Sequence, residues 1–125
     1  MLMVLFIYTA NIRGDSYVQA QSTTSKKNIT VKVVSVSKKK IKLKFTNKGR
    51  ADFNYTPSFV LKKRKNGKWK KVKFKEDALF SKTLFKLKGN SSRTHTIVWK
   101  NFFDGNLSKG EYKITWVKDK KFKIK

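Results

Sequence analysis

Apolar and basic residues alternate along this chain with a period of two. In Ile41-Lys42-Leu43-Lys44-Phe45 the apolar side chains fall on one face and the ammonium groups on the other, and residues 122–125 repeat the pattern. Successive side chains of a β-strand point to opposite faces, so this alternation is typical of strands with one buried and one solvated face. The chain is therefore expected to form a β-sheet domain with a lysine-covered outer surface.

The charge of the chain is large for its length. Its 125 residues include 32 Lys and Arg against 7 Asp and Glu, a formal net charge of +25, and 28 of the basic residues are Lys. A hydrophobic content of 38% supplies one core that can keep the chain compact against this self-repulsion. Lysine is a hydrated point charge, so such a surface suits diffuse, salt-sensitive attraction to polyanions. The alternative is a solvated surface without a ligand.

Residues 1–20 resemble a secretory signal peptide. Met1 to Ala10 is apolar but far shorter than the ~20 residues that span a bilayer, and Val18-Gln19-Ala20 has small residues where a signal peptidase cleaves. Neither Lys nor Arg precedes the apolar run, which predicts a truncated signal; an uncleaved anchor is the alternative. The mature chain is expected to have no transmembrane span, to be secreted or associated with the cell surface, and to begin with a polar tether over residues 21–28.

Cysteine is absent from the sequence. Its absence excludes a disulfide framework and a thiolate zinc site. An exported domain without disulfides indicates a Gram-positive bacterial protein.

Residues 29–125 predict about seven short strands without any helix, in an antiparallel β-sandwich. The apolar residues alternate on one face up to Val33 and on the other face from Val34, which predicts a β-bulge or a strand that crosses between sheets. The expected strand segments are 29–36, 40–46, the surroundings of Phe53 and Tyr55, a hairpin over 58–75, an irregular segment within 76–89, the strand of His95 to Trp99, 111–118, and 121–125 after a short lysine-rich turn. The expected core is Ile41, Leu43, Phe45, Leu61, Ile97, Trp99, Ile114, Trp116 and Ile124.

The hairpin over residues 58–75 is the most concentrated basic segment. Asn66-Gly67 tolerates the positive φ angles of a tight turn between its two strands. A cationic arm with an aromatic ring can track a phosphate polymer and stack on a base or sugar. The candidate polyanion-binding residues are Lys62, Lys63, Arg64, Lys65, Lys68, Trp69, Lys70, Lys71 and Lys73. The alternative is that Trp69 packs across the hairpin and the lysines are only solvated.

Catalytic motifs do not stand out. His95 is the only histidine, and Ser92 and Asp104 lack the surroundings of a nucleophile elbow. The adjacent acids Glu76 and Asp77 are expected to form local salt bridges with lysines. The protein is therefore expected to have no catalytic residues, no metal site and no cofactor.

Three segments resemble the immunoglobulin-like domain of secreted Gram-positive bacterial proteins: Tyr55 to Lys63, Asn66 to Val72 with Phe74 to Asp77, and Leu107-Ser-Lys-Gly-Glu-Tyr-Lys-Ile. Tyr112 in the last segment is similar to the tyrosine-corner residue of such sandwiches. The resemblance implies an extracytoplasmic immunoglobulin-like β-sandwich and carries no catalytic residues with it.

These observations favour a secreted, non-enzymatic binding module that associates with anionic cell-surface polymers such as teichoic acid. Two alternatives stay open. One is a module that blocks a protein partner, of the inhibitor or immunity type. The other is an exported nucleic-acid binder that acts through charge alone.

Overall fold

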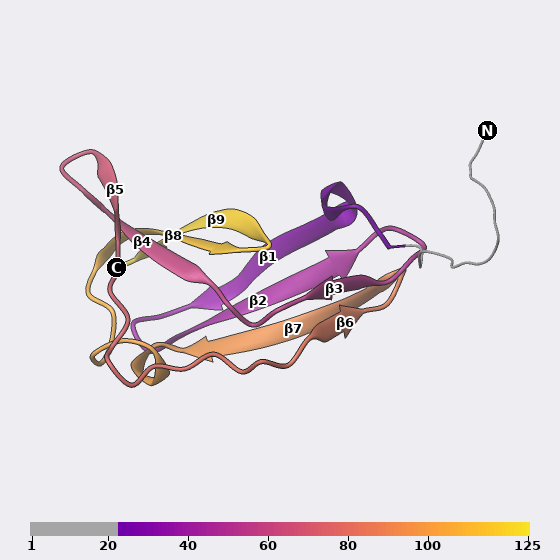
Figure 1. The fold of residues 1–125 in the computed structure, drawn as a ribbon. Coiled ribbons are helices and arrows are strands. Elements are labelled where there is room, and N and C mark those ends of the chain that lie inside the picture. Colours follow the sequence, from indigo (N-terminus) through magenta and orange to yellow (C-terminus); the bar gives the residue numbers. More distant parts are fainter. Residues whose placement is uncertain (1–22) are drawn as a thin grey trace.

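The structure is a computed structural model that describes residues 23–125, and the predicted signal peptide, residues 1–20, lies outside them. The described chain consists of strands, loops and two short 3₁₀ turns (Figure 1). The strands are β1 (Ile29–Val36), β2 (Lys40–Asn47), β3 (Phe53–Tyr55), β4 (Val60–Lys65), β5 (Lys68–Lys71), β6 (Phe85–Leu87), β7 (Ser91–Val98), β8 (Gly110–Trp116) and β9 (Lys118–Ile124). Within these residues, no helix is long and apolar enough to cross a membrane.

The strands form a two-layered antiparallel sandwich, which confirms the predicted fold class. One sheet has the order β1-β2-β7 and the other the order β5-β4-β8-β9, and β3 pairs with β6. Residues 23–125 form nine strands rather than about seven, and two of the nine, β3 and β6, are three-residue segments that pair with each other. The β4–β5 hairpin projects at one end of the molecule (Figure 1).

The alternation of apolar and basic residues gives each sheet one buried face. Along β2, Ile41, Leu43 and Phe45 are fully buried, whereas Lys42 and Lys44 between them are exposed. In β1 the register shifts between Val33 and Ser35, at the predicted bulge. The intervening Val34 is left 50% exposed, because the bulge turns its side chain away from the core.

All nine predicted core residues are buried, each at most 5% exposed. The two sheets meet through aromatic contacts such as that of Phe45 with Trp116, whose ring centroids are 4.9 Å apart. Both core tryptophans satisfy their indole N–H groups: Trp116 donates to the Thr56 carbonyl at 2.7 Å and Trp99 to the Ser37 carbonyl at 3.1 Å. A buried indole needs such an acceptor.

The prediction that residues 21–28 form a polar tether is wrong for residues 24–28. Thr24 is buried, and its backbone N–H donates to the carbonyl of Asp52 at 3.0 Å. Lys26–Asn28 form a 3₁₀ turn that leads directly into β1, capped by the Ser25 side chain. Polar residues can belong to a domain when their hydrogen-bonding groups find partners there, so composition alone misplaced this boundary.

Two strand ends also differ from the predicted ones. Strand β5 ends at Lys71, three residues before the predicted end at Phe74. The predicted lysine-rich turn before Lys121 is part of β9, and the chain instead reverses at Val117, which has a φ of 68°. A β-branched residue rarely adopts a positive φ, and for that reason the sequence did not indicate this turn.

Candidate anion-binding surface

The β4–β5 hairpin carries all the candidate residues except Lys73, which follows it. Asn66 and Gly67 have φ angles of 52° and 77°, as expected for the tight turn. The cross-strand pairs are Lys62 with Lys71, Lys63 with Lys70, Arg64 with Trp69, and Lys65 with Lys68. Residues directly opposite each other share a face and successive residues alternate, so the candidate residues lie on two faces of the hairpin.

The outer face of the four-stranded sheet carries a row of lysines, one from each strand. Lys71 on β5 pairs with Lys62 on β4, Lys62 pairs with Lys113 on β8, and Lys113 pairs with Lys121 on β9. Neighbouring strands lie about 4.8 Å apart, so the row spans roughly 14 Å. We call Lys71, Lys62, Lys113 and Lys121 the lysine row.

Trp69 lies beside this row with cations around its ring. The Lys113 ammonium is 5.0 Å from the ring centroid, and the Arg64 guanidinium and the Lys121 ammonium are each 6.0 Å away. The negative face of an indole attracts cations at such distances. The ring therefore packs over the sheet and brings together charges from three strands that would otherwise repel one another.

Glu111 is the acid that contacts this group of charges. Its carboxylate lies 3.5 Å from the Arg64 guanidinium and 3.8 Å from the Lys123 ammonium. Both partners are largely exposed, so these ion pairs add little stability. By register Asp119 on β9 lies on the same face, and the two carboxylates cannot balance its basic side chains, so an anionic ligand would lower their mutual repulsion.

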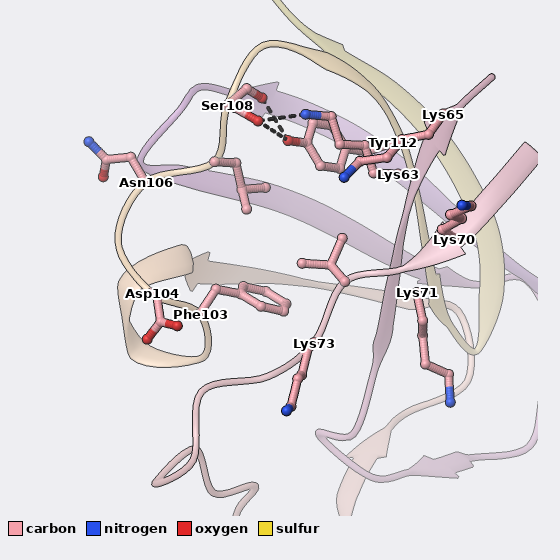
Figure 2. A pocket seen from close by; sticks show the side chains of 12 residues that line it. Lys63, Lys65, Lys70, Lys71, Lys73, Phe103, Asp104, Asn106, Ser108 and Tyr112 are labelled. Atoms are coloured by element: carbon pink, nitrogen blue, oxygen red, sulfur yellow. Dashed lines mark hydrogen bonds between the residues drawn. The ribbon is translucent and has the colours of Figure 1, made fainter.

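The other face of the hairpin borders a cleft beside the loop 103–108 (Figure 2). Lys63, Lys65, Lys70, Lys71 and Lys73 line this cleft. The candidate Lys68 shares this face with Lys65 at the hairpin tip, but it does not line the cleft. The structure thus divides the predicted site into an outer face around Trp69 and a cleft on the opposite side, and Lys71, on the edge strand β5, belongs to the lysine row and also lines the cleft.

His95 has a structural environment. Its Nε2 atom lies 2.5 Å from the Tyr55 hydroxyl, and its ring contacts Phe85 and Trp116 at centroid distances of 4.9 and 4.8 Å. Burial, together with the nearby positive charge of Arg93, lowers the pKa of His95 to about 4. Burial also raises the pKa of the Tyr55 hydroxyl.

Other candidates for chemistry also have structural roles. Ser92 contacts Thr46 through their hydroxyl groups, 3.0 Å apart. Asp77 lies 3.9 Å from the Lys75 ammonium, in the kind of local salt bridge that was expected. Among residues 23–125, no three His, Cys, Asp or Glu side chains gather where they could hold a metal ion.

The sequence did not point to Lys113, Lys121 and Lys123, which extend the outer face beyond the hairpin. Their alternation with Tyr112, Ile114 and Phe122 places them on the solvent side of β8 and β9. Their position on the same sheet face as the outer side of the hairpin depends on the strand order β5-β4-β8-β9, which local patterning does not encode. Ser108, at the cleft, was missed for the same reason.

Tyr112 forms the predicted corner, because its hydroxyl donates to the Ser108 carbonyl four residues upstream at 2.7 Å. In comparison with known families, the family model described as "Bacterial Ig-like domain" matches residues 21–122. No curated protein is similar enough to this chain to count as a match.

Proposed function

Because the chain belongs to the family of bacterial Ig-like domains, we propose that it is a non-enzymatic binding module that holds anionic cell-surface polymers against its four-stranded sheet. The observation that carries this proposal is the lysine row beside Trp69. The lysine row places ammonium groups from neighbouring strands on the outer face of the sheet. The Trp69 ring has three cations, from Arg64, Lys113 and Lys121, within 6.0 Å of its centroid.

A phosphate polymer such as teichoic acid is the ligand class that fits this face best. Its repeated charges match a row of point charges about 14 Å long, and lysines impose no directional pattern on the polymer. Trp69 adds an apolar surface on which a sugar or polyol can rest. Nucleic acid would bind to the same charges, but lysine-dominated contacts carry no sequence readout.

The decisive experiment compares two variants of equal charge. In the first, Lys62, Lys113, Lys121 and Lys123 on the outer face of the four-stranded sheet become Gln. In the second, Lys32, Lys40, Lys42 and Lys44, which are exposed on the three-stranded sheet, become Gln. Each variant lowers the net charge by four, so long-range attraction changes equally.

Retention on immobilised poly(glycerol phosphate) is measured for both variants across a salt series. We expect the first variant to elute at clearly lower salt, with a shallower dependence of affinity on salt, because fewer counterions are displaced on binding. The second variant should stay close to the parent. Equal losses in the two variants would show that total charge alone holds the polymer and would refute a defined binding face.

The proposed location is extracytoplasmic. The apolar run and Val18-Gln19-Ala20 support export with cleavage after Ala20. Expression in a Gram-positive host behind a basic n-region should give an extracytoplasmic chain that begins at Gln21. Amino-terminal sequencing that finds Met1 on the exported protein would indicate an uncleaved anchor instead.

Blocking of a protein partner is the second candidate, and one observation favours it. Between β5 and β6, Leu79 is 85% exposed and Leu84 is 60% exposed. Exposed apolar side chains on one loop are a common feature of protein contacts. Such binding would be stoichiometric and would persist at high salt, and Leu79→Ser with Leu84→Ser would abolish it without weakening polymer retention.

A further inference from the structure

A cleft of about 450 Å³ lies between the β4–β5 hairpin and the loop 103–108 (Figure 2). It is on the opposite face of the hairpin from Trp69. Five of its twelve lining residues are lysines, and one, Asp104, is an acid. Within residues 23–125, no carboxylate lies within 4.0 Å of any of these five ammonium groups. The cleft therefore concentrates positive charge around a small volume.

One of the five lysines is held in place before any ligand arrives. The Lys63 ammonium donates to the Ser108 hydroxyl oxygen at 2.6 Å and lies 5.5 Å from the centroid of the Tyr112 ring. The Tyr112 hydroxyl in turn donates to the Ser108 carbonyl and fixes the loop to β8 (Figure 2). A donor that is already ordered loses little conformational entropy when it binds a ligand.

This arrangement leaves hydrogen-bond donors free to face an anion. Lys63 keeps two of its three N–H groups beyond its bond to Ser108. The Ser108 hydroxyl oxygen accepts a hydrogen bond from Lys63. The hydroxyl hydrogen of Ser108 can point to the Tyr112 hydroxyl oxygen, which is 3.3 Å away. This is a long hydrogen bond, and an anionic oxygen would replace it. The other lining lysines lie on the hairpin or, in the case of Lys73, directly after it.

We propose that the cleft binds a single phosphate ester group. A phosphate monoester carries nearly two negative charges and three strong acceptor oxygens, so several ammonium groups and a hydroxyl can share it. A carboxylate brings one charge and two oxygens and would leave most of the lysines unbalanced. The volume also lies in the range of small-ligand pockets, so it accommodates a short polyol attached to the phosphate.

The cleft shares Lys71 with the lysine row, and its other four lysines lie outside that row. Two sources of a phosphate ester group can be distinguished at this cleft. A terminal phosphate of a polymer, or a free phosphorylated polyol, presents a monoester. An internal polymer linkage presents a diester with one charge. Glycerol phosphate and glycerophosphoglycerol are the probes for these two forms, with inorganic phosphate as the minimal ligand and acetate at equal ionic strength as the carboxylate comparison.

The test is a titration of the ¹⁵N-labelled full chain followed by NMR. Lys63→Gln with Lys70→Gln removes a cross-strand pair on the cleft face, and Lys113→Gln with Lys121→Gln removes a matched pair on the outer face. We expect phosphate to shift the amide signals of residues 63, 70 and 104–108. Affinity should fall about tenfold in the cleft pair, which loses charged hydrogen-bond donors, and less than twofold in the outer pair.

Two single variants keep the test decisive if the cleft pair folds poorly. Ser108→Ala leaves the charge unchanged but removes the anchor of Lys63, and it should weaken phosphate binding about threefold while polymer retention stays at the parent level. Asp104→Asn should strengthen phosphate binding about twofold.

Equal losses in the cleft and outer pairs, or acetate binding as tight as phosphate, would overturn the assignment. So would an unchanged phosphate affinity in Ser108→Ala. These outcomes are independent of the polymer experiment, because the outer-face variant should lose polymer retention and keep phosphate binding.

Discussion

Trp116 and Trp69 show how the same side chain serves different purposes in this molecule. Trp116 is 5% exposed, contacts Phe45 across the sheets and donates to a backbone carbonyl. Trp69 is partly exposed and is bordered by cations on the outer face of the sheet. The first ring holds the two layers together, and the second arranges surface charge.

We therefore expect truncation of Trp116 to affect mainly stability and truncation of Trp69 to affect mainly polymer retention. Trp116→Ala should lower the free energy of unfolding by about 3–5 kcal/mol, because it leaves a large cavity in the core. Trp69→Ala should cost less than about 1 kcal/mol but weaken polymer retention. Denaturant unfolding and salt elution measure the two effects, and a strongly destabilised Trp69→Ala variant would contradict this division of roles.

His95 should make stability depend on pH. Its folded-state pKa of about 4 lies below its ordinary value, so the unfolded chain binds the extra proton more readily between about pH 4 and 6.5. Stability from this group is fully present above pH 6.5 and is lost as the pH falls towards 4. Tyr55, Phe45, Phe85 and Trp116 surround the ring and offer it no negative charge.

A His95→Gln variant isolates this contribution from the other titrating groups. The difference in unfolding free energy between pH 7 and pH 4 should be about 1–2 kcal/mol larger in the parent, after allowance for the partial exposure of the ring. Chemical unfolding at the two pH values provides the comparison. An equal pH dependence in both proteins would show that His95 does not contribute.

At the level of elements, Gly89 allows two loops to cross. It lies between β6 and β7, beside the loop of Gly49 and Arg50, where a Cβ atom would overlap the carbonyl of Arg50. The neighbouring Asn90 N–H donates to the Gly49 carbonyl at 3.0 Å, and the Gly89 N–H donates to the Asp52 carboxylate at 3.3 Å. The crossing links the β2–β3 connection to the start of β7.

Gly89→Ala should therefore cost about 2–4 kcal/mol, because backbone on both sides must move to admit the methyl group. Gly67→Ala at the hairpin tip is the comparison, since no heavy atom lies within 4 Å of its Cβ position and its cost is the strain of a φ of 77°, about 1–2 kcal/mol. Thermal unfolding of both variants gives the order of the two costs, and a reversed order would refute the crowded crossing.

On the scale of the whole molecule, the surplus of positive charge opposes compactness. The +25 charge is spread over both sheets, and the ion pairs within residues 23–125 involve only a few of the lysines. Repulsion between exposed charges reaches about 30 Å at 0.01 M salt, but counterions shorten this distance to about 8 Å at 0.15 M.

The melting temperature should therefore rise as salt increases over this range, and rise again when a soluble polyanion is added. Both four-lysine variants should show a weaker dependence on salt than the parent, because each carries less charge. Circular dichroism melts in the two buffers provide the measurement, and a melting temperature that falls with added salt would contradict the expected repulsion.

Local patterning was enough to predict most of the strands and the whole expected core. A period of two sorts side chains between two faces without knowledge of the neighbouring strands, so residues such as Leu43 and Ile114 could be assigned to the interior and the bulge at Val34 could be located. The Asn66-Gly67 turn and the corner of Tyr112 were predictable for the same reason, since each depends on residues close together in the sequence.

The arrangement of charge required the folded chain. Lys62 and Lys113 face each other because β8 lies beside β4, a pairing between segments about fifty residues apart. Lys63 follows Lys62 in β4 and points to the opposite face, where its ammonium group donates to the Ser108 hydroxyl oxygen at the cleft. Thr24 belongs to the domain through partners on a distant loop. Contacts of this kind depend on strand order and loop packing, which the alternation of one strand does not specify.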